Sequence, residues 1–201
     1  MITIIDYDAG NIRSVEKAFI HLGQEVRITR DRDEILSASH VVLPGVGSFG
    51  DAMQHLKAYH LISTIYDVID KKTPFLGICL GQQLLFENSD ESKGVTGLGI
   101  LSGDILKIPS GNGLKIPHMG WNSLTVDPNA RLFKGLEKDP YVYFVHSYYL
   151  KAKNRSDIAA QTFYNVAIDA SVEHDNIFAC QFHPEKSSQS GLKILKNFTE
   201  I

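Results

Sequence analysis

The sequence predicts an α/β fold in which a mixed, mostly parallel central sheet is flanked by helices and extended by antiparallel strands. Strand-like and helix-like segments alternate four times over the first 90 residues, which is typical of parallel βαβ units with right-handed crossovers. Later in the chain, strand-like segments follow one another with turn residues between them, which indicates hairpins and antiparallel pairing. A long helical pattern returns at 190–199 (SGLKILKNFT), so we expect a helix to close the fold.

The first half begins with a short apolar run at 2–6 (ITIID), which is typical of a buried strand. Apolar residues then recur at helical spacing from Ile12 to Leu22, and Gly23 is a typical helix stop. The same reasoning predicts strands at 25–29, His40–Leu43 and Phe75–Ile78, a short helix at 31–37, and helices at Asp51–Tyr59, Leu61–Asp70 and Leu80–Glu87.

The second half consists mainly of short strand-like segments bounded by turn residues. We predict strands at 103–108, 121–126, 141–146, 158–163, 166–172 and 177–182. The sequence shows no internal repeat, linker or low-complexity tract, so we expect a single domain that spans residues 1–201.

The composition is that of an ordinary globular protein, with 43% hydrophobic and 21% charged residues and a net charge of −3. The near-neutral charge argues against nucleic-acid binding, which requires a basic surface. Two cysteines are too few for a disulfide framework or a Cys-rich zinc site, and we expect no metal or organic cofactor. Asp6 and Asp8 do not fit a signal peptide, and no apolar run approaches the roughly 20 residues of a membrane span. We therefore expect a cytoplasmic protein that does not bind membranes.

Cys79 is the strongest candidate for a nucleophile. It follows an apolar strand and precedes a helical pattern in GICLG (77–81), which is the cysteine counterpart of the G-x-S-x-G nucleophile elbow. The glycines allow the backbone segments of a tight turn to approach closely, and a helix N-terminus favours a thiolate. The alternative is an inert, buried cysteine, which is our interpretation of Cys180 inside a later strand.

A cysteine nucleophile requires a base and a group that orients the base. Of the eight histidines, His183 fits best, because it ends an apolar strand and is followed by Pro184 and Glu185. Residues i and i+2 of an extended segment point to the same side, so the Glu185 carboxylate can fix the imidazole tautomer as in a Ser-His-Asp triad. His146 also ends an apolar strand and is the second candidate base. His118 lies in IPHMGWN without a nearby acid.

A glycine-rich turn at 44–50 (PGVGSFG) lies between a strand and a helix. Its glycines form G-x-G-x-x-G, the pattern of a dinucleotide site. However, the turn does not belong to the first βαβ unit, and the acidic residues about 20 positions further on, Asp67 and Asp70, lie in or at the end of a helix, whereas a dinucleotide site needs an acid near the end of the next strand. The backbone N–H groups of Gly45 and Gly47 can instead bind an oxyanion. If the third and fourth strands are neighbours, this turn lies beside Cys79 and acts together with the N–H of Leu80.

GICLGQQ around Cys79, together with FHPE at 182–185, resembles the motifs of class I (triad-type) glutamine amidotransferases, and the resemblance covers essentially the whole chain. It implies a flavodoxin-like α/β fold and a glutaminase with a Cys-His-Glu triad. Within this family, four segments resemble those of the glutaminase subunits of imidazole glycerol phosphate synthases: PGVGSFGDAM (44–53), IPHMGWN (116–122), YFVHSYY (143–149) and FHPEKSSQSG (182–191).

The resemblance also implies roles for individual residues. Cys79 corresponds to the nucleophile, and His183 and Glu185 correspond to its two catalytic partners. At position 82 this chain has Gln where Met or His is usual in the family. The remaining residues correspond to the oxyanion site (Gly45, Val46, Gly47, Leu80), the glutamine site (Gly47, Gln83, His146, Ser147, Tyr148), and the partner-docking face and ammonia passage (Met119, Trp121, Asn122, Tyr143, Lys186).

In the family, such a subunit forms a heterodimer with a cyclase subunit, which uses the ammonia to form imidazole glycerol phosphate and AICAR in histidine biosynthesis. A stand-alone γ-glutamyl hydrolase, or a glutaminase that serves another acceptor, would use the same three residues. An alternative from a different class is a nucleotide-binding regulatory module that uses the G-x-G-x-x-G turn, with Cys79 in a structural role.

Overall fold

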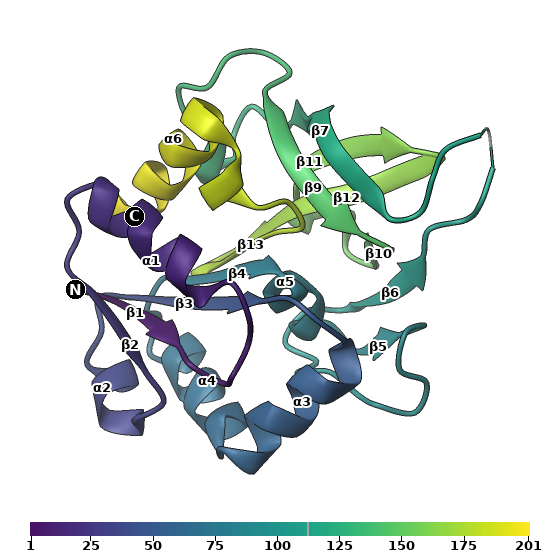
Figure 1. Cartoon of the computed structure of the whole chain (residues 1–201). Coiled ribbons are helices and arrows are strands. Elements are labelled where there is room, and N and C mark those ends of the chain that lie inside the picture. Colours follow the sequence, from purple (N-terminus) through teal and green to yellow (C-terminus); the bar gives the residue numbers. More distant parts are fainter. Residues whose placement is uncertain (112) are drawn as a thin grey trace.

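The central sheet of the computed structural model, which describes residues 1–111 and 113–201, has eight strands in the order β2-β1-β3-β4-β13-β12-β11-β8 (Figure 1). The first five strands are parallel and the last three run antiparallel, which confirms the expected mixed α/β fold. The parallel part has the 2-1-3-4-5 order of flavodoxin-like folds. The strands are β1 (Ile2–Ile5), β2 (Val26–Thr29), β3 (His40–Gly45), β4 (Phe75–Cys79), β8 (Thr125–Val126), β11 (Ile158–Tyr164), β12 (Val166–His174) and β13 (Ile177–Cys180).

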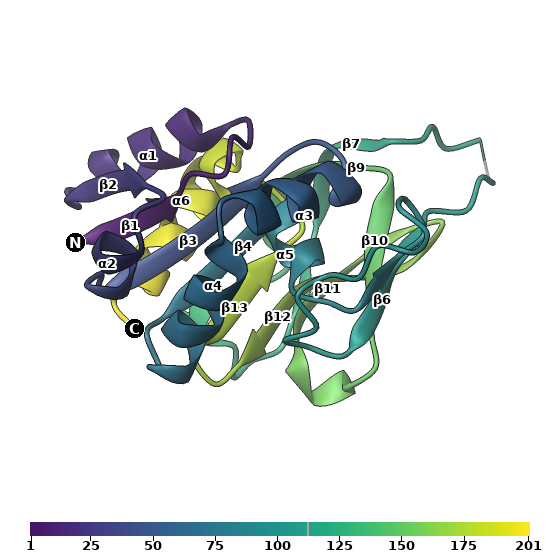
Figure 2. The same cartoon turned by 90° about the horizontal axis from the view of Figure 1, so that it is seen from below.

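Helices cover both faces of the parallel strands (Figures 1 and 2). Helices α1 and α6 pack on one face, where Phe19 and Phe198 share a core cluster with Ile4 of β1. Helices α2 to α5 pack on the other face, in the cluster that contains Ile5. Successive strand residues thus face opposite, buried sides, which is why these strands are continuous apolar runs. The helices are α1 (Ile12–His21), α2 (Arg32–Leu36), α3 (Phe49–Ala58), α4 (Leu61–Asp70), α5 (Leu80–Leu84), α6 (Ser188–Thr199) and the short 3-10 helices η1 (Arg131–Phe133), η2 (Arg155–Asp157) and η3 (Pro184–Lys186).

Two smaller groups of strands adjoin the antiparallel side of the molecule (Figure 1). Strand β6 (Gly103–Lys107) pairs with β5 (Asn88–Ser89) and with β10 (Tyr148–Ala152), and β7 (His118–Ser123) pairs with β9 (Tyr141–His146). Strand β10 is not among the strands predicted from the sequence. Two successive residues of this strand are buried, so it lacks the alternation that indicates a strand, and its partner β6 is distant in the sequence.

Helix α5 is shorter than the helix expected at Leu80–Glu87. The carbonyl oxygen of Leu84 accepts a hydrogen bond from the N–H of Leu98 at 2.8 Å. A later segment thus occupies an acceptor that a longer helix would use for its own next turn.

The strand expected at 121–126 is divided into β7 and β8. Leu124, between them, is fully buried, and its N–H donates to the Pro140 carbonyl at 3.0 Å. The two pieces consequently pair with different strands, β9 and β11. The other expected elements are present, with ends that differ by a few residues.

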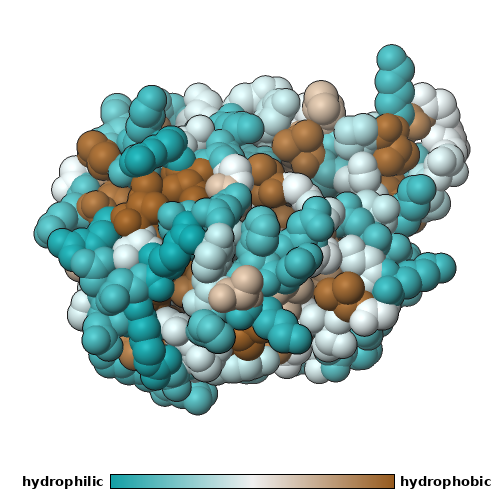
Figure 3. Space-filling view, turned by 60° about the horizontal axis from the view of Figure 1, so that its bottom comes forward, coloured by the Kyte–Doolittle hydropathy of each residue, from teal (hydrophilic) through white to brown (hydrophobic). Residues whose placement is uncertain are grey.

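The surface turned forward in Figure 3 is largely hydrophilic, with hydrophobic areas of limited size between the polar side chains. Single exposed hydrophobic side chains are normal on folded proteins. Among the described residues, no helix has the length and apolar character needed to cross a membrane.

Candidate active site

The residues expected to act together meet at the carboxyl edge of the parallel strands. Cys79 is the last residue of β4, and its register partner in β3 is Gly45, where the glycine-rich turn begins. Strands β3 and β4 are therefore neighbours, as the sequence argument required. His183 and Glu185 follow β13, which lies on the other side of β4. Ligand sites of open parallel sheets lie at this edge.

Cys79 lies in a tight strand-to-helix turn with φ 55° and ψ −108°, a conformation that non-glycine residues rarely adopt. A Cβ atom at Gly77 would lie 2.7 Å from the carbonyl oxygen of Gly81, and a Cβ atom at Gly81 would lie 1.8 Å from the carbonyl oxygen of Leu43. Both distances are far inside van der Waals contact, so this turn requires glycine at both positions. The GICLG segment thus has the elbow geometry that its sequence predicts.

His183 and Glu185 form a buried pair behind this turn. Nδ1 of His183 lies 2.8 Å from Oε1 of Glu185, and both side chains are almost completely buried. A proton on Nδ1 donates to the carboxylate and leaves a lone pair on Nε2, an atom without a hydrogen bond to any described residue. Burial acts to lower the pKa of His183, but interactions with Cys79 and Glu185 outweigh it and raise the pKa to about 9. These contacts therefore favour an imidazolium beside Cys79.

The glycine-rich turn after β3 lies against the first residue of α5. A Cβ atom at Gly45 would lie 3.1 Å from Cβ of Leu80 and 2.2 Å from the Tyr7 hydroxyl oxygen. Tyr7 is buried and donates its hydroxyl hydrogen to the Pro44 carbonyl at 2.7 Å. Burial raises the pKa of Tyr7, so this donor stays protonated and holds the end of β3. Gly47 has a φ of 112°, which favours glycine.

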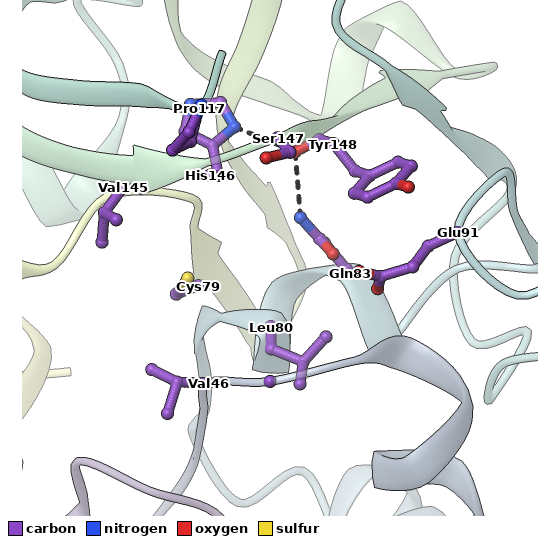
Figure 4. A pocket seen from close by; sticks show the side chains of 11 residues that line it. Val46, Cys79, Leu80, Gln83, Glu91, Pro117, Val145, His146, Ser147 and Tyr148 are labelled. Carbon is purple, nitrogen blue, oxygen red and sulfur yellow. Dashed lines mark hydrogen bonds between the residues drawn. The ribbon is translucent and has the colours of Figure 1, made fainter.

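A cavity of about 340 Å³ opens beside Cys79 (Figure 4), and its size suits a small polar molecule. Its walls come from the turn after β3, the start of α5 and the connection between β9 and β10. Glu91 contributes a carboxylate to the wall. The lining includes Cys79 and these residues expected at the oxyanion and glutamine sites: Val46, Gly47, Leu80, Gln83, His146, Ser147 and Tyr148.

Two glutamine side chains connect Cys79 to the wall of this cavity. Nε2 of Gln181, a residue that the sequence analysis did not select, lies 3.7 Å from the Cys79 sulfur. Oε1 of Gln181 accepts a hydrogen bond from Nε2 of Gln83 at 2.8 Å, and the same Nε2 donates to the Tyr148 carbonyl at 3.1 Å. Gln181 approaches Cys79 because β13 pairs with β4, which is a long-range contact without a local sequence signal.

His146 and His118 are hydrogen-bonded to each other, and the contacts of His146 determine which ring is the donor. Nδ1 of His146 lies 2.9 Å from the Tyr148 carbonyl oxygen and must donate to it, so Nε2 of His146 accepts from Nδ1 of His118 at 2.9 Å. Burial lowers the pKa of His146 to about 3 and the pKa of His118 to about 4, so both rings are neutral at pH 7. Because both ring nitrogens of His146 are engaged, His183 is the better placed base.

Strands β7 and β9 present a face with large exposed side chains. Trp121 is the register partner of Tyr143. The exposed fraction of the surface is 62% for Met119 and 52% for Trp121. Successive strand residues face opposite sides, so the Asn122 side chain points the other way and donates to the Phe163 carbonyl at 3.1 Å. The Asn122 side chain thus lies on the opposite side of β7 from Trp121, and its expected part in partner docking stays a prediction.

Backbone hydrogen bonds join this exposed face to His183. The Tyr143 carbonyl accepts from the N–H of His183 at 2.9 Å, and the N–H of Tyr143 donates to the Ser187 hydroxyl oxygen at 2.9 Å. The Ser187 hydroxyl in turn donates to the His183 carbonyl at 2.6 Å. Lys186, between these two residues, is exposed. A displacement of β9 would therefore reach the backbone of His183 directly.

The chain is similar to known proteins along nearly its whole length. The model of the glutamine amidotransferase class-I family matches residues 3–201. The chain is 50% identical over 201 residues to imidazole glycerol phosphate synthase subunit HisH of Caldanaerobacter subterraneus subsp. tengcongensis, with 100% of this chain and 98% of that protein covered. It is 47% identical to the subunit HisH of Methanocaldococcus jannaschii, with both chains covered completely (100%).

Solved structures with the same fold include a glutamine amidotransferase with a TM-score of 0.78 at 16% identity, covering 100% of this chain and 98% of the other. They also include PurLQS from Thermotoga maritima, with a TM-score of 0.75 at 20% identity and coverage of 99% and 97%. At such low identity these two likenesses concern the fold.

Proposed function

Because the chain belongs to the class I glutamine amidotransferase family, we propose that it is the glutaminase subunit of an imidazole glycerol phosphate synthase. It hydrolyses glutamine to glutamate through a γ-glutamyl thioester on Cys79 and supplies the ammonia to a cyclase subunit. The observation that carries this proposal is the placement of Cys79 in a positive-φ turn, at the wall of a cavity and next to the buried pair of His183 and Glu185.

In this proposal Cys79 is the nucleophile and His183 moves the protons. Contacts with Cys79 and Glu185 raise the pKa of His183, so the ring can take the Cys79 proton, and the sulfur then attacks the γ-carboxamide carbon of glutamine. Backbone N–H groups of the turn at Gly45–Gly47 and of Leu80 bind the developing oxyanion. His183 donates its proton to the departing ammonia and then activates the water that hydrolyses the thioester. Glu185 keeps the ring in the required tautomer.

The cavity beside Cys79 supplies the groups that glutamine recognition needs. The substrate carries an ammonium and a carboxylate at one end and the reacting carboxamide at the other. Glu91 offers a carboxylate for the ammonium, and His146, Ser147 and Tyr148, which the resemblance assigns to the glutamine site, line the same cavity. The hydrogen bond between Gln83 and the Tyr148 carbonyl (Figure 4) holds this wall in place.

The exposed face of β7 and β9 is the proposed docking surface for the cyclase subunit. Aromatic residues and methionine are enriched where proteins associate, and Met119, Trp121 and Tyr143 lie together on this face. The hydrogen bond between the Tyr143 carbonyl and the His183 N–H gives a docked partner a direct mechanical link to the triad. Delivery to an adjacent partner also keeps ammonia unprotonated, because in bulk water at neutral pH it would take up a proton.

A glutaminase assay with and without the cyclase subunit and its nucleotide ligand tests the proposal. We expect slow glutamate release by the isolated chain and a clear increase when the liganded cyclase is added. Equal glutamate release in both conditions would instead indicate a stand-alone hydrolase. Dinucleotide binding by a chain whose Cys79 does not react with a glutamine-mimicking diazoketone would indicate the regulatory module.

Changing Gly47 to Ala is expected to lower glutamine turnover about tenfold without weakening cyclase docking. Gly47 has a φ of +112°, and no atom of the described residues lies within 4 Å of an added Cβ. The substitution therefore acts through backbone strain of about 1–3 kcal/mol and not through a clash. The strain moves the N–H groups of the oxyanion turn. Turnover is measured by glutamate release and docking by titration calorimetry.

Gly23→Ala is the matched control. Gly23 also has a positive φ (+77°), and in the part of the chain that the structure describes no atom lies within 4 Å of an added Cβ, but Gly23 lies after α1, away from Cys79. We expect Gly23→Ala to leave turnover unchanged. Equal losses of docking and turnover in Gly47→Ala would contradict the proposed role of the turn.

A further inference from the structure

The side chain of Asn11 contacts the triad. The position of Asn11 in front of helix α1 does not account for this contact. Asn11 is the N-cap residue of α1, where asparagine ordinarily binds the first N–H groups of the helix, but its side chain makes no such cap bond to the described residues. Nδ2 of Asn11 instead donates to Oε1 of Glu185 at 2.5 Å. This is the same oxygen that accepts from Nδ1 of His183.

We propose that Asn11 is a positioning residue of the triad, which holds the Glu185 carboxylate in the orientation that directs His183 at Cys79. The inference rests on the proposed glutaminase chemistry and adds a fourth side chain to it. Asn11 does not line the cavity beside Cys79, and its Nδ2 also lies 3.5 Å from Nδ1 of His183, so it acts on the orientation of Glu185 and His183.

The surroundings of Glu185 show why a second donor matters. The carboxylate is fully buried, and its other oxygen, Oε2, has no hydrogen-bond partner among the described residues. A buried carboxylate is strongly destabilised unless hydrogen-bond donors face it. Among the described residues, Oε1 accepts from two donors, Asn11 and His183, and both keep these hydrogens during proton transfer, because the proton moves at Nε2 of His183. Asn11 therefore gives the carboxylate a donor that does not belong to the ring that Glu185 must orient.

The backbone holds Asn11 ready for this contact. Asn11 has a φ of 70°, a left-handed conformation that asparagine tolerates better than most residues. The preceding loop is anchored, because Arg30 bonds to Asp6 at 2.9 Å and to Asp8 at 2.6 Å, and the Tyr59 hydroxyl donates to Asp8. Asn11 thus follows a loop that these contacts hold in place, and its side-chain amide needs little change of conformation to reach Glu185.

The test compares two substitutions of Asn11 by the rate at which a glutamine-mimicking diazoketone alkylates Cys79 in the full chain. Asn11→Gly removes the amide and permits the left-handed backbone. Asn11→Asp keeps the shape and capping ability of the side chain but places a second carboxylate against Glu185. We expect the maximal alkylation rate to fall about 10- to 100-fold in Asn11→Gly, the range for losing a hydrogen bond to a charged group, and further in Asn11→Asp. The half-saturating reagent concentration should stay unchanged.

Asn165→Gly is the matched control, because Asn165 is also a left-handed asparagine (φ 59°) whose Nδ2 donates to a backbone carbonyl, that of Pro109 at 3.1 Å. We expect it to react at the wild-type rate. If Asn11 had a purely structural role, Asn11→Asp would react with the diazoketone at least as fast as Asn11→Gly. That result would overturn the inference. A wild-type alkylation rate in Asn11→Gly would overturn it as well.

The alkylation and glutaminase measurements distinguish a failure of the Asn11 inference from a failure of the proposed function. Alkylation of wild-type Cys79 without stimulation of glutamate release by the cyclase would remove the proposed partner and still allow the Asn11 comparison. A wild-type chain that does not react at Cys79 would overturn both.

Discussion

Replacing Cys79 with Ser is expected to remove glutamine-dependent synthesis of imidazole glycerol phosphate, with a loss of about a thousandfold or more. The serine hydroxyl keeps the position but not the nucleophilicity of a thiolate, because it ionises far less readily. Synthesis from added ammonia by the complex should continue at the wild-type rate, since the cyclase reaction does not use Cys79. The measurement is product formation with glutamine or with an ammonium salt as the nitrogen source.

Cys180→Ser provides the matched control for this prediction. Cys180 is the other free cysteine of the chain, fully buried in β13, and burial raises the pKa of its thiol well above the ordinary value. We expect glutamine-dependent synthesis to persist in Cys180→Ser. Substantial glutamine-dependent synthesis by Cys79→Ser, or its loss in Cys180→Ser, would contradict the assignment of the nucleophile.

Replacing Gly81 with Ala is expected to have the largest effect on the structure of the site. The added Cβ would lie 1.8 Å from the Leu43 carbonyl oxygen, so α5 and β3 must separate. Forced overpacking against backbone costs about 3 kcal/mol, which lowers Tm by about 6–12 °C in a domain of this size. The same displacement moves the N–H of Leu80 and the Cys79 sulfur, so we expect alkylation of Cys79 by the diazoketone to be largely lost.

Thermal unfolding and the alkylation rate measure these two effects separately. Gly111→Ala serves as the control, because an added Cβ there meets no atom of the described residues within 4 Å and Gly111 is not among the described glycines with a positive φ. If Gly81→Ala unfolds at the same temperature as Gly111→Ala and still reacts at Cys79, the close approach of α5 to β3 is not required.

The Cys79 turn and the triad acid could be predicted from the sequence because their signals are local. Apolar residues before Cys79, glycines on both sides and a helical pattern after it describe a tight strand-to-helix turn within a few residues. The separation of two residues between His183 and Glu185 likewise suffices to bring their side chains together when the chain is extended, and the observed distance is 2.8 Å.

Other parts of the site depend on contacts between distant segments. Asn11 looks like an ordinary helix N-cap in the sequence, and Gln181 looks like a polar residue at the end of a strand. Their contacts with Glu185 and with the Cys79 sulfur exist because loops after β1 and β13 reach the same edge of the sheet. The bond from His118 to His146 likewise depends on the pairing of β7 with β9.

The sequence by itself determined the α/β class, the order of most elements and the turn that presents Cys79, because periodicity and glycine placement act over a few residues. The tertiary structure decided the order of the strands in the sheet, the pairing of β10 with β6, and the side chains that surround the triad. The physical reason is that hydrogen bonds such as that of Asn11 to Glu185 join residues 174 positions apart. Such bonds depend on the sheet that brings the two loops together, and the local sequence around either residue does not indicate the other.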